Sequence, residues 1–146
     1  MAIQTFAGAT VAISTVPFVG TIDSTGFGAA TYTTIAEVTA VPAFGKVYKL
    51  VTHNPIGTRY TKKLKGSYDN GKLDLKYALD TSDAGQTLLQ TASDSDSSYA
   101  YRVTMQNGTL YYFTAKAMSF QIEGGSVDSI VAGTTSLEID STIVKV

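Results

Sequence analysis

The chain has 146 residues, which predicts a single domain with one hydrophobic core. It contains no cysteine, so it has neither a disulfide nor a thiolate nucleophile, and its net charge of −1 argues against a general nucleic-acid binder. No charged segment is followed by a long apolar run, so we expect neither a signal peptide nor a membrane span.

The first half of the chain predicts strands and one long loop. Residues 1–30 are rich in small residues and nearly uncharged, and we expect an extended N-terminal arm that contains a short strand over residues 9–14. β-Branched and aromatic residues predict strands over residues 32–41 and 46–53. Residues 54–65 begin with turn residues and are expected to form a long inter-subunit loop, because long ordered loops are usually functional.

Basic residues gather in part of this region. Residues 46–65 hold six basic residues and no acidic one, while the rest of the chain is acidic. The segment is either a solvated loop that carries lysines or a surface that pairs with an acidic surface of another copy.

The middle of the chain predicts a strand, a helix and another strand. Apolar and polar residues alternate over residues 72–79, after the turn residues Asp69-Asn70-Gly71, and again over residues 99–105. Residues 80–92 between them have helical spacing. We expect this to be the only substantial helix.

That helix has a predicted start and a predicted buried side. Asp80 or Ser82 can cap it, because a short side-chain oxygen accepts from the free amides of a first turn. Leu88 and Leu89 lie on its apolar stripe, and we expect both to anchor the helix to a sheet.

The C-terminal third predicts strands joined by tight turns. Asn107-Gly108 is a strong hairpin signal that leads into a long strand over residues 109–123. Residues 126–132 and 134–144 are expected to complete the sheet. About eight short strands with one flanking helix predict a mainly β fold, a β-sandwich or partly open barrel.

Few residues suggest chemistry. His53 is the single histidine and has no nucleophile motif nearby, so we interpret it as a surface imidazole. Asp94 and Asp96 offer oxygens to calcium, but the segment lacks the spaced glycine and the final glutamate of a calcium-binding loop. We therefore predict no catalytic residue, no cofactor and no metal site.

Several stretches, taken in order, carry a family resemblance. They are residues 32–38 followed by Phe44-Gly45, residues 54–59 followed by 65–71, and residues 75–77 leading to 83–89. In order and spacing they resemble the major tail tube proteins of long-tailed, siphovirus-type bacteriophages over residues 9–143. The lysine-rich loop and the acidic end of the helix are not part of the resemblance.

The resemblance implies a virion protein that is assembled in the host cytoplasm and forms hexameric rings stacked into a tube. Four strands of each subunit would join one continuous β-barrel around a lumen that holds tape-measure protein and then passing DNA. Tail terminator and distal tail proteins would be further partners. The physics is consistent, since a barrel closed between subunits satisfies edge strands.

Two sets of residues are candidates for roles in the tube: one for contacts between rings and one for lining the lumen. The candidate contacts between rings are Arg59, Lys62, Lys63 and Lys65. The candidates for lining the lumen are Glu37, Glu123, Glu138 and Asp140, of which we expect at least two to face it. Carboxylates there would hold phosphates off; on a lone sandwich they would simply meet water.

Other functions stay open from sequence alone. The chain is also consistent with a virion-surface or secreted β-sandwich that binds carbohydrate, which exposed aromatic side chains on one patch would favour. A related secretion tube or a tail-completion protein is a further alternative, and an enzyme is the least favoured.

Overall fold

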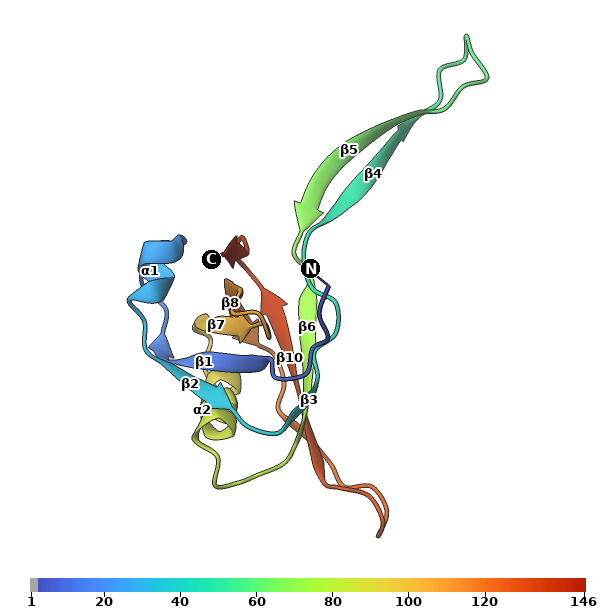
Figure 1. The fold of residues 1–146 in the computed structure, drawn as a ribbon. Coiled ribbons are helices and arrows are strands. Elements are labelled where there is room, and N and C mark those ends of the chain that lie inside the picture. The colour runs from blue at the N-terminus through green and yellow to red at the C-terminus, as the bar shows by residue number, and fades with distance from the viewer. Residues whose placement is uncertain (1–2) are drawn as a thin grey trace.

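The computed structural model describes residues 3–146, within which eleven strands and two helices are found (Figure 1). The strands are β1 (Thr10–Pro17), β2 (Tyr32–Ile35), β3 (Val38–Ala40), β4 (Val47–His53), β5 (Lys62–Asp69), β6 (Lys72–Ala78), β7 (Tyr99–Thr104), β8 (Leu110–Ala117), β9 (Gln121–Glu123), β10 (Ala132–Ile139) and β11 (Val144–Lys145). The helices are α1 (Ser24–Gly28) and α2 (Ala84–Ser93). The mainly β fold expected from the sequence is confirmed.

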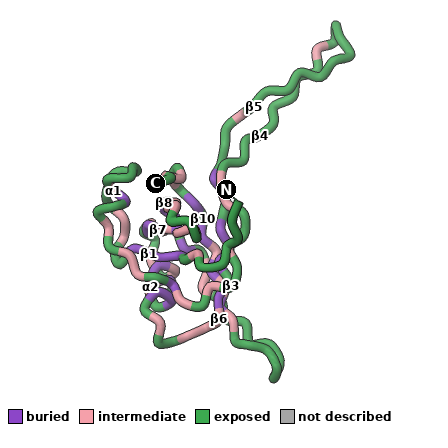
Figure 2. Tube along the Cα trace, in the orientation of Figure 1, coloured by how far each residue is buried: buried purple, intermediate pink, exposed green. Residues whose placement is uncertain are grey.

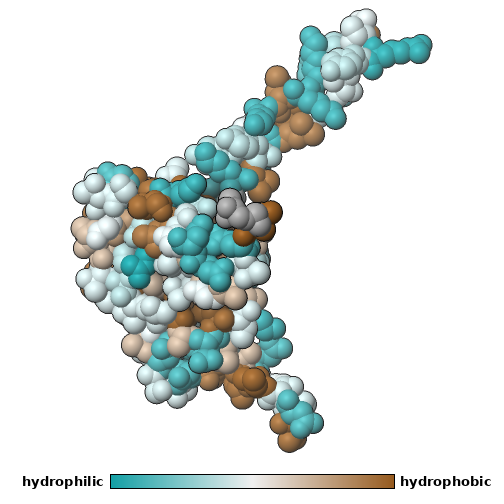
Figure 3. Space-filling model, viewed as in Figure 1, coloured by the Kyte–Doolittle hydropathy of each residue, from teal (hydrophilic) through white to brown (hydrophobic). Residues whose placement is uncertain are grey.

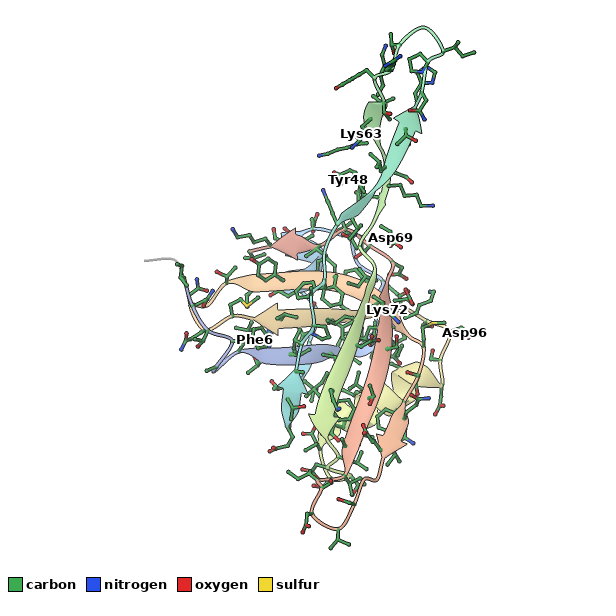
Figure 4. All side chains as sticks on the ribbon, turned by 90° about the vertical axis from the view of Figure 1, so that its right-hand side faces the viewer. Phe6, Tyr48, Lys63, Asp69, Lys72 and Asp96 are labelled. Carbon is green, nitrogen blue, oxygen red and sulfur yellow. The ribbon has the colours of Figure 1, made fainter. Side chains whose placement is uncertain are left out.

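Nine strands form one curled sheet. Its order is β2-β1-β7-β8-β10-β6-β3, with β11 beside β8 and β9 beside β10. Strand β10 pairs with β6 along almost its whole length but with only the last part of β8, at residues 115–117. The sheet therefore folds over into a partly open barrel, in which β6 and β10 cross the direction of β1, β7 and β8 (Figures 1 and 4).

The core lies inside this curl. Because side chains alternate along a strand, every second residue points inward, and the other residues point out. The largest side chains that are fully buried in the main cluster are Tyr77, Tyr101, Phe113, Ile13, Leu73, Leu75, Leu89 and Leu137. Figure 2 shows these buried positions confined to the body of the molecule. Gly133 lies directly opposite Tyr77, and the Tyr77 ring fills the space that a larger residue would need.

Helix α2 begins later than the sequence predicts. Asp83 is the N-cap residue, and its carboxylate accepts from the backbone amides of Gln86 at 2.9 Å and Ala36 at 3.2 Å. Asp80, one of the expected caps, instead accepts from Ser82. Both expected caps are therefore wrong, Asp80 by three residues and Ser82 by one, because the Asp83 carboxylate accepts from the first turn of α2 and also from the distant turn after β2.

The short helix α1 was not expected. Asp23 caps it by accepting from the Gly26 amide at 2.7 Å, and Phe27 is buried between the rings of Phe18 and Tyr112. From the sequence, residues 24–28 were expected to belong to the extended N-terminal arm, because glycine at positions 26 and 28 is typical of a loop. The buried Phe27 ring, together with the hydrogen bond from the Tyr32 hydroxyl to the Phe27 carbonyl at 3.0 Å, holds this turn of helix on the sheet.

Several expected boundaries are wrong. The predicted arm over residues 1–30 is part of the fold from β1 onward, since β1 lies between β2 and β7; residues 1–2 lie outside the described residues. The strand expected over residues 32–41 is broken by a turn at Glu37, whose φ is +61°. The strand over residues 109–123 is interrupted between β8 and β9, and most of residues 126–132 are loop.

Candidate assembly surfaces

The hairpin β4–β5 projects from the body and forms a sheet of its own (Figure 1). The expected loop over residues 54–65 is shorter than predicted, because Lys62 already belongs to β5. Pairing runs from Val47 opposite Asp69 to His53 opposite Lys62, with a bulge after Tyr48. Every residue of the two strands is exposed except Gly66, which is half-buried.

Aromatic rings and lysines stiffen the base of this hairpin. Tyr48 and Tyr68 lie directly opposite each other with ring centroids 5.3 Å apart. The Lys65 ammonium lies 4.7 Å from the Tyr48 ring, and the Lys46 ammonium lies 4.8 Å from the Tyr68 ring. Cation–π contacts of this kind stabilise exposed pairs by about 0.5–1 kcal/mol each. The hairpin therefore has stabilising contacts of its own at the end that joins the body.

Apolar side chains on both faces of the hairpin meet water. Val47 is 71% exposed, Leu50 is 65% exposed and Leu64 is 61% exposed. Leu50 and Leu64 point to opposite faces, because Val51 is the residue paired with Leu64. Figure 3 shows hydrophobic residues interspersed with hydrophilic ones along the projection. An isolated two-stranded hairpin is marginal in water, so this surface is suited to being covered.

The four candidate inter-ring residues all lie on this hairpin. Arg59 is in the connecting loop, and Lys62, Lys63 and Lys65 are in β5. Lys63 and Tyr48 are labelled on the hairpin in Figure 4. Sequence reasoning found the charges and the strand that contains Leu50, but it read Leu64 as part of the loop, although Leu64 between Lys63 and Lys65 has the alternation of a strand.

The outward face of β6, β10 and β9 is polar. Its side chains are Lys72, Asp74 and Lys76 on β6, Thr134, Ser136 and Glu138 on β10, and Gln121 and Glu123 on β9. Lys72 approaches Asp74 at 3.8 Å, and Lys76 approaches Glu123 at 3.7 Å. We call this the mosaic face, because both signs of charge alternate across it. It is the side turned to the viewer in Figure 4.

The candidate lumen residues separate into two groups. Glu123 and Glu138 lie on the mosaic face. Glu37 lies instead in the turn before β3, and Asp140 follows the end of β10. The expectation that Glu37 lies within a strand is wrong, since it lies in the turn between β2 and β3.

Asp140 is the centre of a small polar network. Partial burial acts to raise its pKa, but hydrogen bonds from Ser98 and Thr114 and the nearby Lys116 ammonium outweigh this and hold the pKa below 3.8. The Lys116 Nζ lies 3.6 Å from the carboxylate. Asp140 therefore fastens β10 to β8 as well as meeting solvent.

The mosaic face belongs to a set of strands with open edges. Strand β3 pairs with β6 on one side, and β9 pairs with β10 on one side. Within the described residues, neither strand pairs with another strand along its far edge. Unpaired edge groups are templates for a strand from another chain.

The structure supplies little that suggests chemistry. Over residues 3–146 there is no group of three or more His, Asp or Glu side chains placed to hold a metal ion. His53 lies at the end of β4 on the exposed hairpin. No helix in the described part of the chain is both long and apolar enough to span a membrane.

No family model matches this chain, and no curated protein matches it. Among solved structures, a chain from the sheath/tube terminator of an extracellular contractile injection system (PVC, extended state) has a TM-score of 0.71 at 8% identity, covering 100% of this chain and 98% of that chain. The tail of an empty gene transfer agent particle gives 0.66 at 14% identity, covering 97% of each chain. The SPP1 tail tube gives 0.65 at 16% identity, covering 97% of this chain and 78% of that chain. The chain therefore shares its fold with phage tail tube proteins, as the sequence resemblance implied.

Proposed function

We propose that the chain is a major tail tube subunit, a structural protein of the virion that assembles into hexameric rings stacked as a conduit for DNA ejection. The observation that carries this proposal is the hairpin β4–β5, which exposes Val47, Leu50 and Leu64 together with a row of lysines. A surface of this composition costs stability in an isolated subunit and gains stability when another copy covers it. A structural role requires no catalytic site.

Open strand edges support the ring. Strands β3, β6, β10 and β9 form a four-stranded layer with one free edge at β3 and one at β9. Pairing β3 of one copy with β9 of the next would continue the layer around a barrel and satisfy both edges. Growing the barrel in this way needs no change in the fold of the subunit.

The mosaic face would then line the lumen. Lysine–carboxylate pairs on it leave little net charge, so DNA phosphates would find neither a basic track nor an apolar surface to hold them. Glu123 and Glu138 are the two lumen candidates that this arrangement retains. Glu37 and Asp140 are not expected to line it, because Glu37 lies in the turn before β3 and Asp140 follows the end of β10, both outside the mosaic face.

Stacking would place the hairpin between rings. Arg59, Lys62, Lys63 and Lys65 are exposed along it, and no acidic residue lies between Lys46 and Lys65. Each exposed ion pair is weak, about 0–1 kcal/mol, but a ring repeats the contact around its circumference. The tape-measure protein in the lumen, and terminator and distal proteins at the two ends, would complete the tail after assembly in the host cytoplasm.

Electron microscopy of concentrated protein tests the proposal. The unmodified protein is expected to form tubes, and Lys62→Glu/Lys63→Glu/Lys65→Glu is expected to lower the polymerised fraction while circular dichroism stays unchanged. The matched Lys→Arg variant at the same three positions keeps the charge and should polymerise like the parent. Purified protein that stays monomeric at high concentration, or a glutamate variant with tubes in unchanged yield, contradicts the assignment.

A second candidate function is that of a tail-completion protein, because a chain of a sheath/tube terminator structure has this fold. A tail-completion protein would form single rings that do not stack. Micrographs with rings alone at every concentration would favour that role, whereas tubes of many rings favour the tube subunit.

The lumen assignment has its own test. Glu123→Lys/Glu138→Lys should leave tubes intact but slow DNA ejection from reconstituted particles, most at low salt, where screening is weakest. A structure of the assembled tube that places both residues on the outer wall would refute the assignment.

A further inference from the structure

The end of the body opposite the hairpin carries a second unusual surface. Strand register defines this end: Ala78 pairs with Ala132, which in turn pairs with Glu123. The loop of residues 124–131 extends beyond these three residues, and Figure 1 shows it projecting away from the hairpin at the other extreme of the molecule.

Apolar side chains are exposed at this end, which we call the far tip. They are Ile122, Val127, Ile130 and Val131. Figure 3 shows hydrophobic residues at the lower extremity of the molecule. Beside them is a hollow lined in part by Leu79, Phe120 and Ile122, between β9 and α2. Apolar residues at the extremity of a loop have no core to join within their own subunit.

Carboxylates surround these apolar side chains. Glu37 joins the far tip because its carbonyl accepts from the Ala78 amide at 2.9 Å, and Asp128 lies in the projecting loop. Asp80 follows the end of β6. In the described residues, no basic side chain approaches the carboxylates of Glu37, Asp80 or Asp128 within 4.0 Å. The far tip is thus apolar and acidic, while the hairpin is apolar and basic.

We propose that the far tip of one copy is the binding site for the β4–β5 hairpin of the next copy. This inference rests on the proposed stacking of rings, and it identifies the surface of the neighbouring ring that the hairpin contacts. Opposite charges select the partner and orient it, and the apolar residues Ile56 and Tyr60 in the hairpin loop, both exposed, supply area to bury against the far tip. Since the two surfaces lie at opposite ends of one molecule, the contact is head-to-tail and repeats without closing.

The dimensions allow this contact. The seven residues of β4 span about 23 Å at about 3.3 Å per residue, before the loop is counted. The hairpin therefore reaches well beyond its own body, and only another molecule can cover its end.

A charge exchange tests the pairing. Lys62→Glu/Lys63→Glu/Lys65→Glu and Glu37→Lys/Asp128→Lys should each lower the polymerised fraction, and the two sets combined should restore it. Asp94→Lys/Asp96→Lys, which makes the same change of charge on the turn after α2, is the control and should not restore the hairpin variant. Absence of rescue, or equal rescue by the control pair, overturns the proposal while tubes of the parent protein leave the proposed function standing.

Cross-linking gives an independent measurement, because the chain has no cysteine of its own. Ile56→Cys/Val127→Cys places one thiol in the hairpin loop and one at the far tip, both fully exposed positions that should not disturb folding. A flexible bis-maleimide should convert assembled tubes of this variant into a ladder of covalent multimers. Ile56→Cys/Ser97→Cys should give no ladder. Assembled tubes that yield no ladder from the first pair overturn the proposal, and a parent protein that forms no tube overturns the proposed function as well.

Discussion

Replacing Gln86 by methionine should cost the subunit a large part of its stability. Gln86 is 2% exposed, and its side chain makes three hydrogen bonds. Nε2 donates to the carbonyls of Ala36 at 3.0 Å and Ala78 at 2.9 Å, while Oε1 accepts from the Asp80 amide at 2.9 Å. One amide thus fastens the turn after β2, the end of β6 and the start of α2.

The expected loss follows from those three bonds. A buried polar group left without a partner costs about 1–3 kcal/mol, and methionine would leave three backbone groups unpaired. The hollow beside Gln86 can admit water to some of them, so we expect the free energy of unfolding to fall by about 3 kcal/mol. At a urea slope of about 2 kcal/mol per M, the midpoint should move by roughly 1.5 M.

Urea unfolding of dilute, unassembled protein is the measurement, and Gln90→Met is the control. Gln90 lies on the same helix but is exposed. If the two methionine variants unfold at the same urea concentration, the Gln86 side chain does not hold the three segments together.

Three further substitutions test the packing and the charge of the body. Leu89→Ala should lower the free energy of unfolding by about 2–5 kcal/mol in thermal melts, because Leu89 is fully buried, and Leu88→Ala, at a half-buried position, should lower it less; equal losses would mean that α2 is rotated. Gly85→Ala should destabilise strongly, because its new Cβ would lie 2.3 Å from the Thr34 carbonyl oxygen, whereas Gly28→Ala meets open space and should not; equal melting of the two variants would contradict the close approach of α2 to β2. Because folding holds the pKa of Asp140 below 3.8, the stability that Asp140 adds is present above that pH and is lost as the pH falls through the folded pKa. Asp140→Asn should therefore flatten the acid side of a plot of urea midpoint against pH, and an unchanged acid side would contradict the network.

Local patterns predicted the body of the sheet well. Alternation over residues 72–79 gave β6, and Asn107-Gly108 gave the β7–β8 hairpin, because a half-buried strand and a short turn are encoded by neighbouring residues. The order of short stretches also predicted the fold shared with tail tube proteins. None of these features needs knowledge of distant contacts.

Features that depend on distant partners were missed. Asp83 is the cap of α2 because Ala36, far away in sequence, shares its carboxylate. The first half of β5, residues 62–65, was read as loop because it has a single apolar residue, Leu64, and it is a strand because pairing with β4 satisfies a backbone that no core covers. Glu37 has a left-handed backbone that sequence patterns rarely indicate for a glutamate.

The glycines at the base of the hairpin affect how a tube of these subunits would bend. The two connections between the hairpin and the body each contain a glycine with a left-handed backbone: Gly45, with φ +136°, precedes β4, and Gly71, with φ +75°, follows β5. The two glycines line one hollow. Tyr48 and Tyr68 pack against each other just above this level, and glycine tolerates a wider range of backbone angles than other residues, so we expect rotation between the hairpin and the body to concentrate at the two glycines. A stacked tube of such subunits would bend by many small turns at these joints, each hairpin staying seated while its own ring tilts.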